Sequence, residues 1–387
     1  MDALAGSGSD LKNLAQSDDT RVMIKALQSK DKLKDIGHAG TAMRFLTGYY
    51  ASGKEDVILT GSDRMKERPI GILVDALREL GARIDYMKHP GFPPLRIKGT
   101  ALRGGRIAVD GSVSSQFISA LLMISPMVSG GLEIELTGKL VSKTYIRMTL
   151  ELMRMFGIEY QWSGQRIYIQ EGAYRLSDIK VESDWSAASY WYAFAALAND
   201  SQLELPFLFR DSLQGDAVAA DIFDKLLVRS VFSEDSVHID RVEGSLPDLM
   251  DLDFTLCPDL VQTVSVVLCA LGIRYRFTGT QTLRIKETDR ISALQNELKK
   301  FGYVLTSDDQ GSFLAWEGQA CEKEKEPVVE TYHDHRMAMA FAPLALRYGS
   351  IVIHDPMVVT KSYPGFWEDL ERAGFGIKPF DTARRSG

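Results

Sequence analysis

The chemistry that this sequence could perform is suggested first by five consecutive polar residues, 286–290, at the start of an expected helix. Lys286 and Arg290 are cations, and Glu287 lies between them. The helix is expected over 289–301, and the backbone N–H groups of its first turn attract anions. A carboxylate among cations can be a structural ion-pair partner or can transfer protons, and this run alone fits both interpretations.

A second candidate carboxylate is Asp259, which follows Pro258 directly before an apolar helical run over 260–271. Its negative charge could do no more than pair with the helix dipole. Together with Glu287, however, it would place two carboxylates among many cations. That combination suits the transfer of protons on strongly anionic substrates.

Further polar clusters also stand at expected helix starts. Ser114, Ser115 and Gln116 offer hydroxyl and amide donors, which suit a phosphate group but also fit a simple serine N-cap. A guanidinium beside buried surface, such as that of Arg336, needs an anionic partner. The cations in question are Arg64, Lys66 and Arg68 before Pro69, the expected first residue of a helix; Arg336 before the apolar run 337–346; and Lys361 in a Thr-Lys-Ser-Tyr-Pro loop.

The elements that must position these residues recur along the chain. Five polar clusters each precede an apolar helical run, and the steps from Thr41 to Ser115, Trp185, Asp259 and His335 are 74, 70, 74 and 76 residues. Amphipathic helices and short β-like runs lie between them, so each repeat is a mixed α/β unit. The amphipathic helices are expected at 18–27, 69–80, 145–156, 217–227, 289–301 and 366–373, and the β-like runs include 57–60, 106–109, 132–136, 166–169, 281–285 and 351–354.

The repeat predicts two domains. Its midpoint falls near 179–183, so we expect an N-terminal domain over 1–181, a C-terminal domain over 182–380 and a frayed tail over 381–387. A length of 387 residues also exceeds what one hydrophobic core usually supports. Six amphipathic helices accompany only five buried ones, so the first repeat is expected to be truncated, with residues 1–6 as the last turn of its missing helix.

Composition restricts the class of protein. With 45% hydrophobic and 25% charged residues the chain has the composition of a soluble globular protein, and its net charge of −7 argues against nucleic acid as the main partner. The three cysteines lack metal-binding spacing and predict reduced thiols in the cytoplasm. His333 and His335 have no obvious third ligand, so no metal is expected. We find no apolar run of membrane-spanning length and no Walker or Rossmann motif, and therefore expect neither a membrane anchor nor a nucleotide cofactor.

Taken in order over nearly the whole chain, the motifs resemble those of the 5-enolpyruvylshikimate-3-phosphate synthase family. Any one of them is weakly specific, but the ordered set is highly specific. The set comprises Ser17-Asp18-Asp19, Ala39-Gly40-Thr41-Ala42-Met43-Arg44, Arg64-Met65-Lys66-Glu67-Arg68-Pro69, Asp110-Gly111-Ser112-Val113-Ser114-Ser115-Gln116-Phe117, Ser142-Lys143-Thr144-Tyr145-Ile146, Pro258-Asp259, Lys286-Glu287-Thr288-Asp289-Arg290, Asp334-His335-Arg336-Met337-Ala338-Met339 and Lys361.

The resemblance implies a two-domain fold with three βαβαββ units in each domain. It also implies the family's reaction, which joins the 5-hydroxyl group of shikimate 3-phosphate to C2 of phosphoenolpyruvate through a tetrahedral adduct and then expels phosphate, without a metal or organic cofactor. Asp259 would take the hydroxyl proton, and Glu287 would handle the proton at C3. The reaction belongs to the shikimate pathway to chorismate and the aromatic amino acids, and the family is the target of glyphosate.

The resemblance also assigns substrate-binding residues. Shikimate 3-phosphate would be held by Ser114, Ser115, Ser142, Tyr145 and Lys286. Phosphoenolpyruvate would be held by Gly40, Arg68, Gln116, Arg290, Arg336 and Lys361. The expected protein is a cytoplasmic monomer that binds these two small molecules and neither nucleic acid nor membrane.

The sequence departs from the family pattern in several places. The family's opening Lys-Ser motif on the first buried helix has no counterpart, which removes a lysine expected to touch both substrates. His38 stands where asparagine is usual, Phe45 where proline is common and Thr282 where asparagine is common. Two alternatives stay open: an enolpyruvyl transferase acting on UDP-N-acetylglucosamine, although the motifs follow the shikimate pattern, and a truncated form that is weakly active or non-catalytic.

Overall fold

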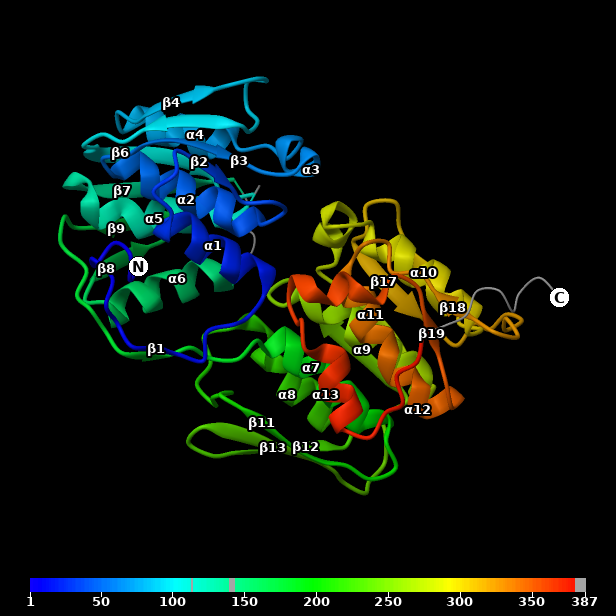
Figure 1. Cartoon of the computed structure of the whole chain (residues 1–387). Coiled ribbons are helices and arrows are strands. Elements are labelled where there is room, and N and C mark those ends of the chain that lie inside the picture. The colour runs from blue at the N-terminus through cyan, green and yellow to red at the C-terminus, as the bar shows by residue number, and fades with distance from the viewer. Residues whose placement is uncertain (113, 139–142, 380–387) are drawn as a thin grey trace. The chain divides into compact units, whose positions relative to one another are not determined.

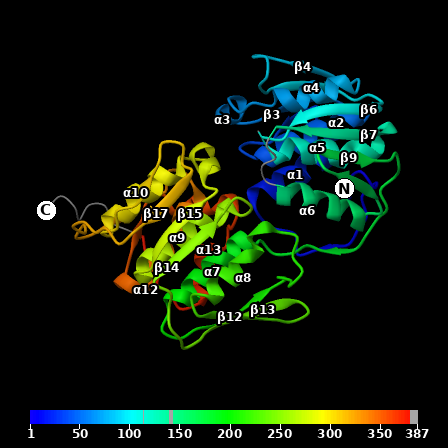
Figure 2. The ribbon, with the colours of Figure 1, turned by 180° about the vertical axis from the view of Figure 1, so that it is seen from behind.

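The computed structural model describes residues 1–112, 114–138 and 143–379. The chain divides into two compact units, Met1–Val181 and Glu182–Gly387, each with its own hydrophobic core (Figure 1, Figure 2). The expected tail 381–387 and the candidate Ser142 lie outside the described residues. Within the described ranges, every helix is too short or too polar to cross a membrane.

Two four-stranded sheets with the same strand order form the framework of the first unit. In each sheet the first two strands are parallel, because a helix connects them, and the last two form an antiparallel pair. The sheet order is β2-β3-β5-β4 for β2 (Leu33–Asp35), β3 (Asp56–Thr60), β4 (Arg83–Tyr86) and β5 (Leu95–Lys98), and β6-β7-β9-β8 for β6 (Arg103–Asp110), β7 (Ser129–Thr137), β8 (Tyr160–Ser163) and β9 (Arg166–Ile169). A short parallel pair of β1 (Leu11–Lys12) and β10 (Ile179–Lys180) joins the two ends of the unit.

The buried helices of the first unit, α2 (Gly40–Ser52) and α5 (Ser115–Ile124), lie side by side and run in the same direction. Near their starts the side chain of Gln116 donates to the hydroxyl of Thr41 (3.1 Å). Farther along, a β-carbon on Gly48 would stand 3.2 Å from the carbonyl oxygen of Ala120, so this glycine permits the close approach. The other helices are α1 (Asp18–Gln28), α3 (Asp63–Lys66), α4 (Gly71–Glu79), the 3-10 turn η1 (Ser125–Met127) and α6 (Lys143–Met155), which packs on α5.

The second unit repeats the plan around a sheet of order β14-β15-β17-β16, with a three-stranded sheet of order β11-β13-β12 and a parallel pair β18-β19. Its strands are β11 (Gln202–Pro206), β12 (Val228–Phe232), β13 (Ser236–Arg241), β14 (Leu249–Asp253), β15 (Arg274–Thr278), β16 (Thr306–Ser307), β17 (Phe313–Trp316), β18 (Val328–Val329) and β19 (Val352–Ile353). Its helices are α7 (Trp185–Leu197), α8 (Ala219–Asp224), α9 (Val261–Leu271), α10 (Arg290–Lys300), α11 (His335–Phe341), α12 (Ala345–Tyr348) and α13 (Phe366–Arg372), with 3-10 turns η2 (Gly215–Val218), η3 (Pro258–Leu260), η4 (Gln281–Ile285), η5 (Ala342–Leu344) and η6 (Pro356–Lys361). Of these, α7, α9 and α11 pack against one another and are almost entirely buried.

Helical structure begins at all five positions where a polar cluster precedes an apolar run. The five elements are α2, α5, α7, the turn η3 that leads into α9, and α11. The amphipathic series is also present, as α1, α4, α6, α8, α10 and α13. The predicted mixed α/β fold is therefore confirmed, and three of its sheets follow the βαβαββ order.

Two local predictions are wrong. Residues 281–285, expected as a β-like run, form the 3-10 turn η4, in which Ile285 is 82% exposed and only Leu283 is buried, so the segment has no alternating face for a sheet to cover. Pro69 does not begin a helix. Its carbonyl accepts a hydrogen bond from Arg44 (3.3 Å), and α4 begins only at Gly71.

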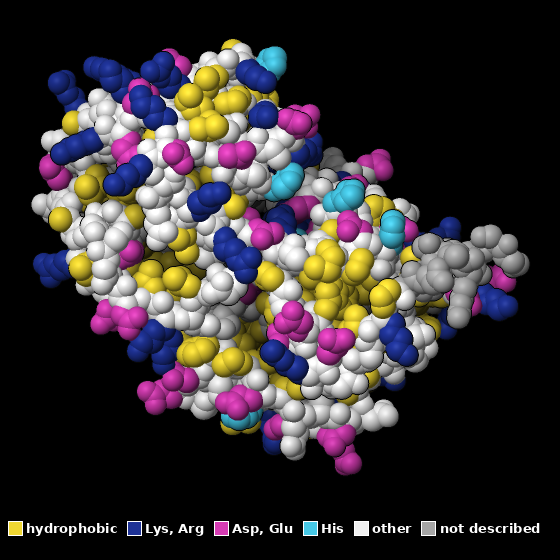
Figure 3. All heavy atoms as spheres, viewed as in Figure 1, with side chains coloured by type: hydrophobic (Ala, Val, Ile, Leu, Met, Phe, Trp, Pro, Cys, Tyr) yellow, Lys and Arg dark blue, Asp and Glu magenta, His cyan; other side chains and the backbone are white. Residues whose placement is uncertain are grey.

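Charged side chains of both signs lie on the face of the molecule shown in Figure 3. On the face shown in Figure 3, Lys and Arg side chains are interspersed with Asp and Glu side chains, and hydrophobic side chains gather in small groups between them. Mixed surface charge gives little long-range attraction for a highly charged ligand. The positive charges that would bind an anionic ligand must therefore belong to a local site.

The contact between α5 and α6 gives a test of this packing. Ser119 and Thr149 share a buried hydrogen bond of 2.7 Å, and the Thr149 hydroxyl itself donates to the carbonyl of Tyr145 (2.9 Å). We expect Thr149→Val to lower the free energy of unfolding by about 1–2 kcal/mol, because the buried Ser119 hydroxyl loses its acceptor. Equilibrium urea unfolding measures the change. The double variant Ser119→Ala/Thr149→Val should lose less than the two single variants combined, and strictly additive losses would contradict the coupling.

Candidate functional site

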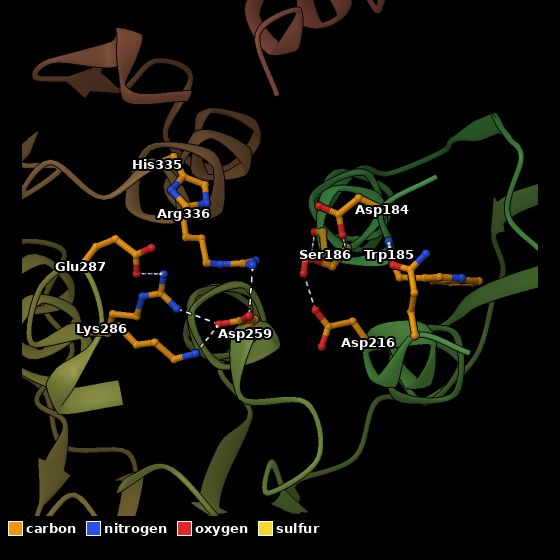
Figure 4. Close-up of polar contacts among 12 residues, drawn as sticks. Asp184, Trp185, Ser186, Asp216, Asp259, Lys286, Glu287, His335 and Arg336 are labelled. Atoms are coloured by element: carbon orange, nitrogen blue, oxygen red, sulfur yellow. Dashed lines mark hydrogen bonds and ion pairs between the residues drawn. The ribbon is translucent and has the colours of Figure 1, made fainter. Parts of the chain in front are cut away.

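Three buried helices of the second unit begin close together, and their first turns carry the polar side chains of the candidate site (Figure 4). Asp184 caps α7 by accepting from the backbone N–H of Ser186 (2.8 Å), and Asp334 caps α11 by accepting from the backbone N–H of Arg336 (2.9 Å). Asp259 lies in η3, which leads into α9. Because α9 packs against both α7 and α11, the three helix starts bring these side chains into one place.

The centre of this site is the guanidinium group of Arg290, the first residue of α10, which is only 1% exposed. Its Nη1 donates to Asp259 (2.8 Å), its Nη2 to Glu287 (2.9 Å) and its Nε to Asp334 (2.7 Å). A buried guanidinium requires anionic acceptors that match its fork of donors. Burial alone would lower the pKa of Arg290, but the charges of Asp334 and Asp259 outweigh it and raise the pKa, so the group stays charged.

Asp259 is in contact with three cations. Besides the bond from Arg290, Nζ of Lys286 lies 3.5 Å from Oδ1 and Nη2 of Arg336 lies 3.2 Å from Oδ2. Burial disfavours the ionised carboxyl, but the charges of Arg336, Lys286 and Arg290 together hold the pKa of Asp259 well below its usual range. Asp259 is therefore ionised near neutral pH, with both carboxylate oxygens engaged by cations.

Glu287 joins two segments that are far apart in the sequence. One carboxylate oxygen pairs with Arg290, and the other pairs with Lys361 at the end of η6. The segment that carries Glu287 is fixed by Asp289, which caps α10 by accepting from the backbone N–H of Ser292 (3.1 Å). Burial opposes ionisation of Glu287, but the charges of Arg290 and Lys361 outweigh it and lower the pKa of the carboxyl.

The site also contains acidic residues to which the sequence analysis assigned no role. Asp334 is fully buried, and Asp216 accepts a hydrogen bond from the hydroxyl of Ser186. Burial first, and then the neighbouring charge of Asp259, raise the pKa of Asp216 to about 6. The position of Asp334 directly before a helix could have identified it as a cap. Asp216 stands in a Gly-Asp-Ala-Val run with no distinctive pattern, so only the packing of α7 against η2 identifies it.

Arg336 and His335 follow Asp334 in the first turn of α11. Nη1 of Arg336 lies 3.4 Å from the hydroxyl of Tyr190 on α7. Burial would lower the pKa of Arg336, but the charge of Asp259 raises it well above the usual value. For His335, burial and then the charge of Arg336 lower the pKa to about 3, so this imidazole is neutral at physiological pH.

In the first unit, the start of α2 holds Arg68 against Gly40. A β-carbon on Gly40 would lie 2.5 Å from Nη1 of Arg68, so the glycine leaves the space that the guanidinium occupies. The segment that carries Arg68 is fixed by Arg44, a buried side chain that donates to the carbonyls of Gly40 (3.0 Å) and Pro69 (3.3 Å). Gly40 and Arg68, two of the predicted site residues, are therefore in contact.

The start of α5 lies beside the start of α2. Ser114 caps α5 by accepting from the backbone N–H of Gln116 (3.3 Å), and the Gln116 side chain reaches Thr41 on α2. Ser115 is the first residue of α5, and Tyr145, which is 38% exposed, lies in the first turn of α6. The first unit thus presents hydroxyl, amide and guanidinium donors at neighbouring helix starts, an arrangement suited to phosphate and carboxylate groups.

The candidates in the second unit form a single ion network. Its four cations are already paired with its three carboxylates, so an anionic ligand that binds these cations must compete with the ion pairs. A carboxylate that loses its cations becomes a stronger base, because its pKa rises toward the usual value. The network consists of the predicted Asp259, Lys286, Glu287, Arg290, Arg336 and Lys361, together with Asp334.

Comparisons with known proteins identify the family of this chain. The family model described as EPSP synthase (3-phosphoshikimate 1-carboxyvinyltransferase) matches residues 24–370. The chain is 51% identical over 377 residues to the 3-phosphoshikimate 1-carboxyvinyltransferase of Bacteroides fragilis (strain YCH46), which covers 97% of this chain and 92% of that relative. It is 38% identical over 404 residues to the enzyme of the same name from Sulfurovum sp. (strain NBC37-1), with 95% of this chain and 91% of that relative covered.

A similar fold is found among solved structures. An EPSP synthase from Acinetobacter baumannii matches with a TM-score of 0.76 and 21% sequence identity, and the match covers 96% of this chain and 92% of that chain. At this identity the likeness concerns the fold alone, whereas the family model and the sequence relatives extend over most of the chain. The chain belongs to the EPSP synthase (3-phosphoshikimate 1-carboxyvinyltransferase) family.

Proposed function

We propose that this chain transfers the enolpyruvyl group of phosphoenolpyruvate to the 5-hydroxyl group of shikimate 3-phosphate and releases phosphate. This is the step of the shikimate pathway toward chorismate and the aromatic amino acids. Family membership supports the proposal, and one observation carries it: two ionised carboxylates, Asp259 and Glu287, are held within one network of four cations. These cations are Lys286, Arg290, Arg336 and Lys361.

The substrates carry several negative charges, and the assigned residues supply matching donors. For shikimate 3-phosphate these are Ser114, Ser115, Ser142, Tyr145 and Lys286. For phosphoenolpyruvate they are Gly40, Arg68, Gln116, Arg290, Arg336 and Lys361. The assignment is supported by the contact of Arg68 with Gly40 and by the position of Gln116 at the start of α5.

The two carboxylates have separate roles in the proton transfers. The oxygen of the 5-hydroxyl group forms a bond to C2 of phosphoenolpyruvate while Asp259 takes the hydroxyl proton and C3 gains a proton from the protonated form of Glu287. In the second step the bond between C2 and the phosphate oxygen breaks, phosphate leaves with the electron pair, and Glu287 takes a proton back from C3. No metal or organic cofactor takes part in this scheme.

The ion network prepares these carboxylates for the reaction. When the phosphate and carboxylate of phosphoenolpyruvate take over Arg290, Arg336 and Lys361, the carboxylates lose the cations that lower their pKa values. Asp259 then becomes a stronger base, and Glu287 can carry a proton. We also propose that the chain is a monomer in the cytoplasm, and its three unpaired cysteine thiols support the cytoplasmic location.

The carboxylate roles are tested by Asp259→Asn and Glu287→Gln. Each variant should lower kcat by roughly a hundredfold or more, because it removes a general acid or base, while the substrates still bind. The measurement is phosphate release from phosphoenolpyruvate and shikimate 3-phosphate, with binding followed by calorimetry. Asp251→Asn and Glu322→Gln change exposed carboxylates and serve as matched controls. Near wild-type turnover in either site variant would show that its role is wrongly assigned.

The contact between Gly40 and Arg68 is tested by Gly40→Ala. The added methyl group displaces the Arg68 guanidinium, so we expect the KM for phosphoenolpyruvate to rise about tenfold or more, the loss typical of a weakened charge-assisted hydrogen bond. The KM for shikimate 3-phosphate should change much less. Gly71→Ala is the control, since its nearest neighbour would be in ordinary contact at 3.6 Å. Equal KM values for phosphoenolpyruvate in both variants would refute the role of this contact.

The raised pKa of Asp216 predicts a pH-dependent stability. An unfolded aspartate has a pKa of 3.8, and Asp216 in the folded chain has a pKa of about 6, so the folded chain binds this proton more tightly. The folded state should therefore gain stability from Asp216 as pH falls through 6, and should lose that gain as pH rises. Between pH 7.5 and pH 5, wild type should gain about 1 kcal/mol in free energy of unfolding relative to Asp216→Asn. Urea unfolding at the two pH values measures this gain, and a difference that does not change with pH would contradict it.

A further inference from the structure

Helix α10 carries a buried acid, Glu297, that takes no part in the ion network. Glu297 is fully buried, and it lies seven residues after Arg290. Seven residues make two helical turns, so both side chains leave the same face of α10. A buried carboxylate needs hydrogen-bond donors, and the donors of Glu297 identify the segment that it holds.

Two of the three donors come from the segment that leads into α11, and the third, Lys300, is the last residue of α10. One oxygen of Glu297 accepts from the backbone N–H of Glu330 (3.0 Å) and from Nζ of Lys300 (2.7 Å), and the other accepts from the hydroxyl of Tyr332 (2.7 Å). Lys300 also donates to the carbonyl of Val328 (2.8 Å). Burial and then the bond to Glu297 raise the pKa of Tyr332 to about 12, so the phenol remains a donor. The end of α10 therefore holds residues 328–332 at three points.

The held segment ends in a turn with an uncommon backbone. Tyr332 and His333 have φ values of 53° and 57°, and the N–H of Asp334 closes the turn on the carbonyl of Thr331 (2.8 Å). Positive φ values at successive turn positions are usually taken by Gly, Asn or Asp. A bulky residue stays in this conformation only when its surroundings hold it there. Glu297 supplies such a restraint through the hydroxyl of Tyr332.

This turn sets the position of the site residues that follow it. Asp334 pairs with Arg290 immediately after the turn, and Arg336 comes two residues later. The same segment includes β18, which pairs with β19. In addition, His333 Nδ1 lies 3.3 Å from Asp355, which directly precedes η6, the turn that ends at Lys361. Two side chains of α10 thus hold the chain before and at the start of α11. Arg290, at the start of α10, binds Asp334, and Glu297, two turns later, binds Glu330 and Tyr332.

We infer that Glu297 is a positioning residue for the phosphoenolpyruvate side of the site. It fixes the turn at 331–334, and this turn places Arg336. Through the pairing of β18 with β19 and the contact of His333 with Asp355, it also fixes the segment 352–361, which places Lys361. The inference rests on the proposed function. A buried ion pair by itself adds little net stability compared with an apolar replacement. Glu297, however, accepts from the backbone N–H of Glu330 and from the hydroxyl of Tyr332 in the strained turn, and that arrangement specifies geometry rather than stability.

The main experiment compares Glu297→Ala with Glu297→Gln. We expect Glu297→Ala to raise the KM for phosphoenolpyruvate about tenfold or more and to change the KM for shikimate 3-phosphate less than twofold, since most residues assigned to the latter lie in the first unit. Glu297→Gln keeps an acceptor for the N–H of Glu330, so its effect should be intermediate. Val237→Ala serves as the control, because it removes buried volume in the β11-β13-β12 sheet without touching the held segment.

A milder variant and a second readout make the test decisive. Tyr332→Phe removes only the hydroxyl that donates to Glu297, and should raise the KM for phosphoenolpyruvate about threefold even if Glu297→Ala does not fold. Backbone hydrogen exchange at residues 330–336 should be at least tenfold faster in Glu297→Ala than in Val237→Ala. If Glu297→Ala does not fold, Tyr332→Phe is compared with Val237→Ala in the same way. Unchanged KM values, equal rises for both substrates, or unchanged exchange would overturn the inference. An inactive wild type with faster exchange in the variant would instead overturn the proposed function and leave the restraint by Glu297 established.

Discussion

The guanidinium group of Arg290 is almost completely buried, and the arrangement of the second unit depends on keeping it neutralised. Its donors reach carboxylates from three separate segments: Asp259 before α9, Glu287 before α10 and Asp334 before α11. Losing one partner of such a buried pair typically costs about 3–5 kcal/mol, because an uncompensated charge is left behind. The helix starts therefore have to meet at one place, and the charged side chains of the site are fixed by the same contacts that hold the helices together.

The first unit solves the burial of an arginine in a different way. Arg44 donates to the carbonyls of Gly40 and Pro69 rather than to carboxylates, and burial, with a smaller effect from Arg68, lowers the pKa of its guanidinium to about 10. Neutral acceptors leave the positive charge of this region uncancelled. Among the described residues, no carboxylate forms an ion pair with Arg44 or Arg68, whereas in the second unit each cation of the ion network is paired with an acid.

The sequence was sufficient to predict the features that depend on local pattern. The period of 70 to 76 residues located the five buried helix starts, and the polar residues at those starts included Asp259 and Arg336. Glu287 and Arg290 were found instead at the start of an amphipathic helix, α10. It could not predict Asp216 or Glu297, because an isolated acid in a helical stretch looks like a solvated surface residue until tertiary packing buries it. The turn at Tyr332 and His333 could not be predicted from the sequence for the same reason, because bulky residues adopt positive φ only under restraint from distant parts of the chain. The run 281–285 shows the opposite error, in which five residues of strand-like composition lack a sheet to pair with.

The carboxylates of the ion network also affect which anions can bind to the second unit, because they already occupy its cations. Asp259 and Glu287 already act as anions bound to Lys286, Arg290, Arg336 and Lys361, so an incoming anion must compete with them. Under the proposed function, a ligand with a phosphate and a carboxylate on one small skeleton would contact several cations at once, and would therefore gain more from displacing these carboxylates than a singly charged ion such as chloride or acetate. Selectivity among the many anions of a cell then comes from the density of charge on the ligand as much as from its shape.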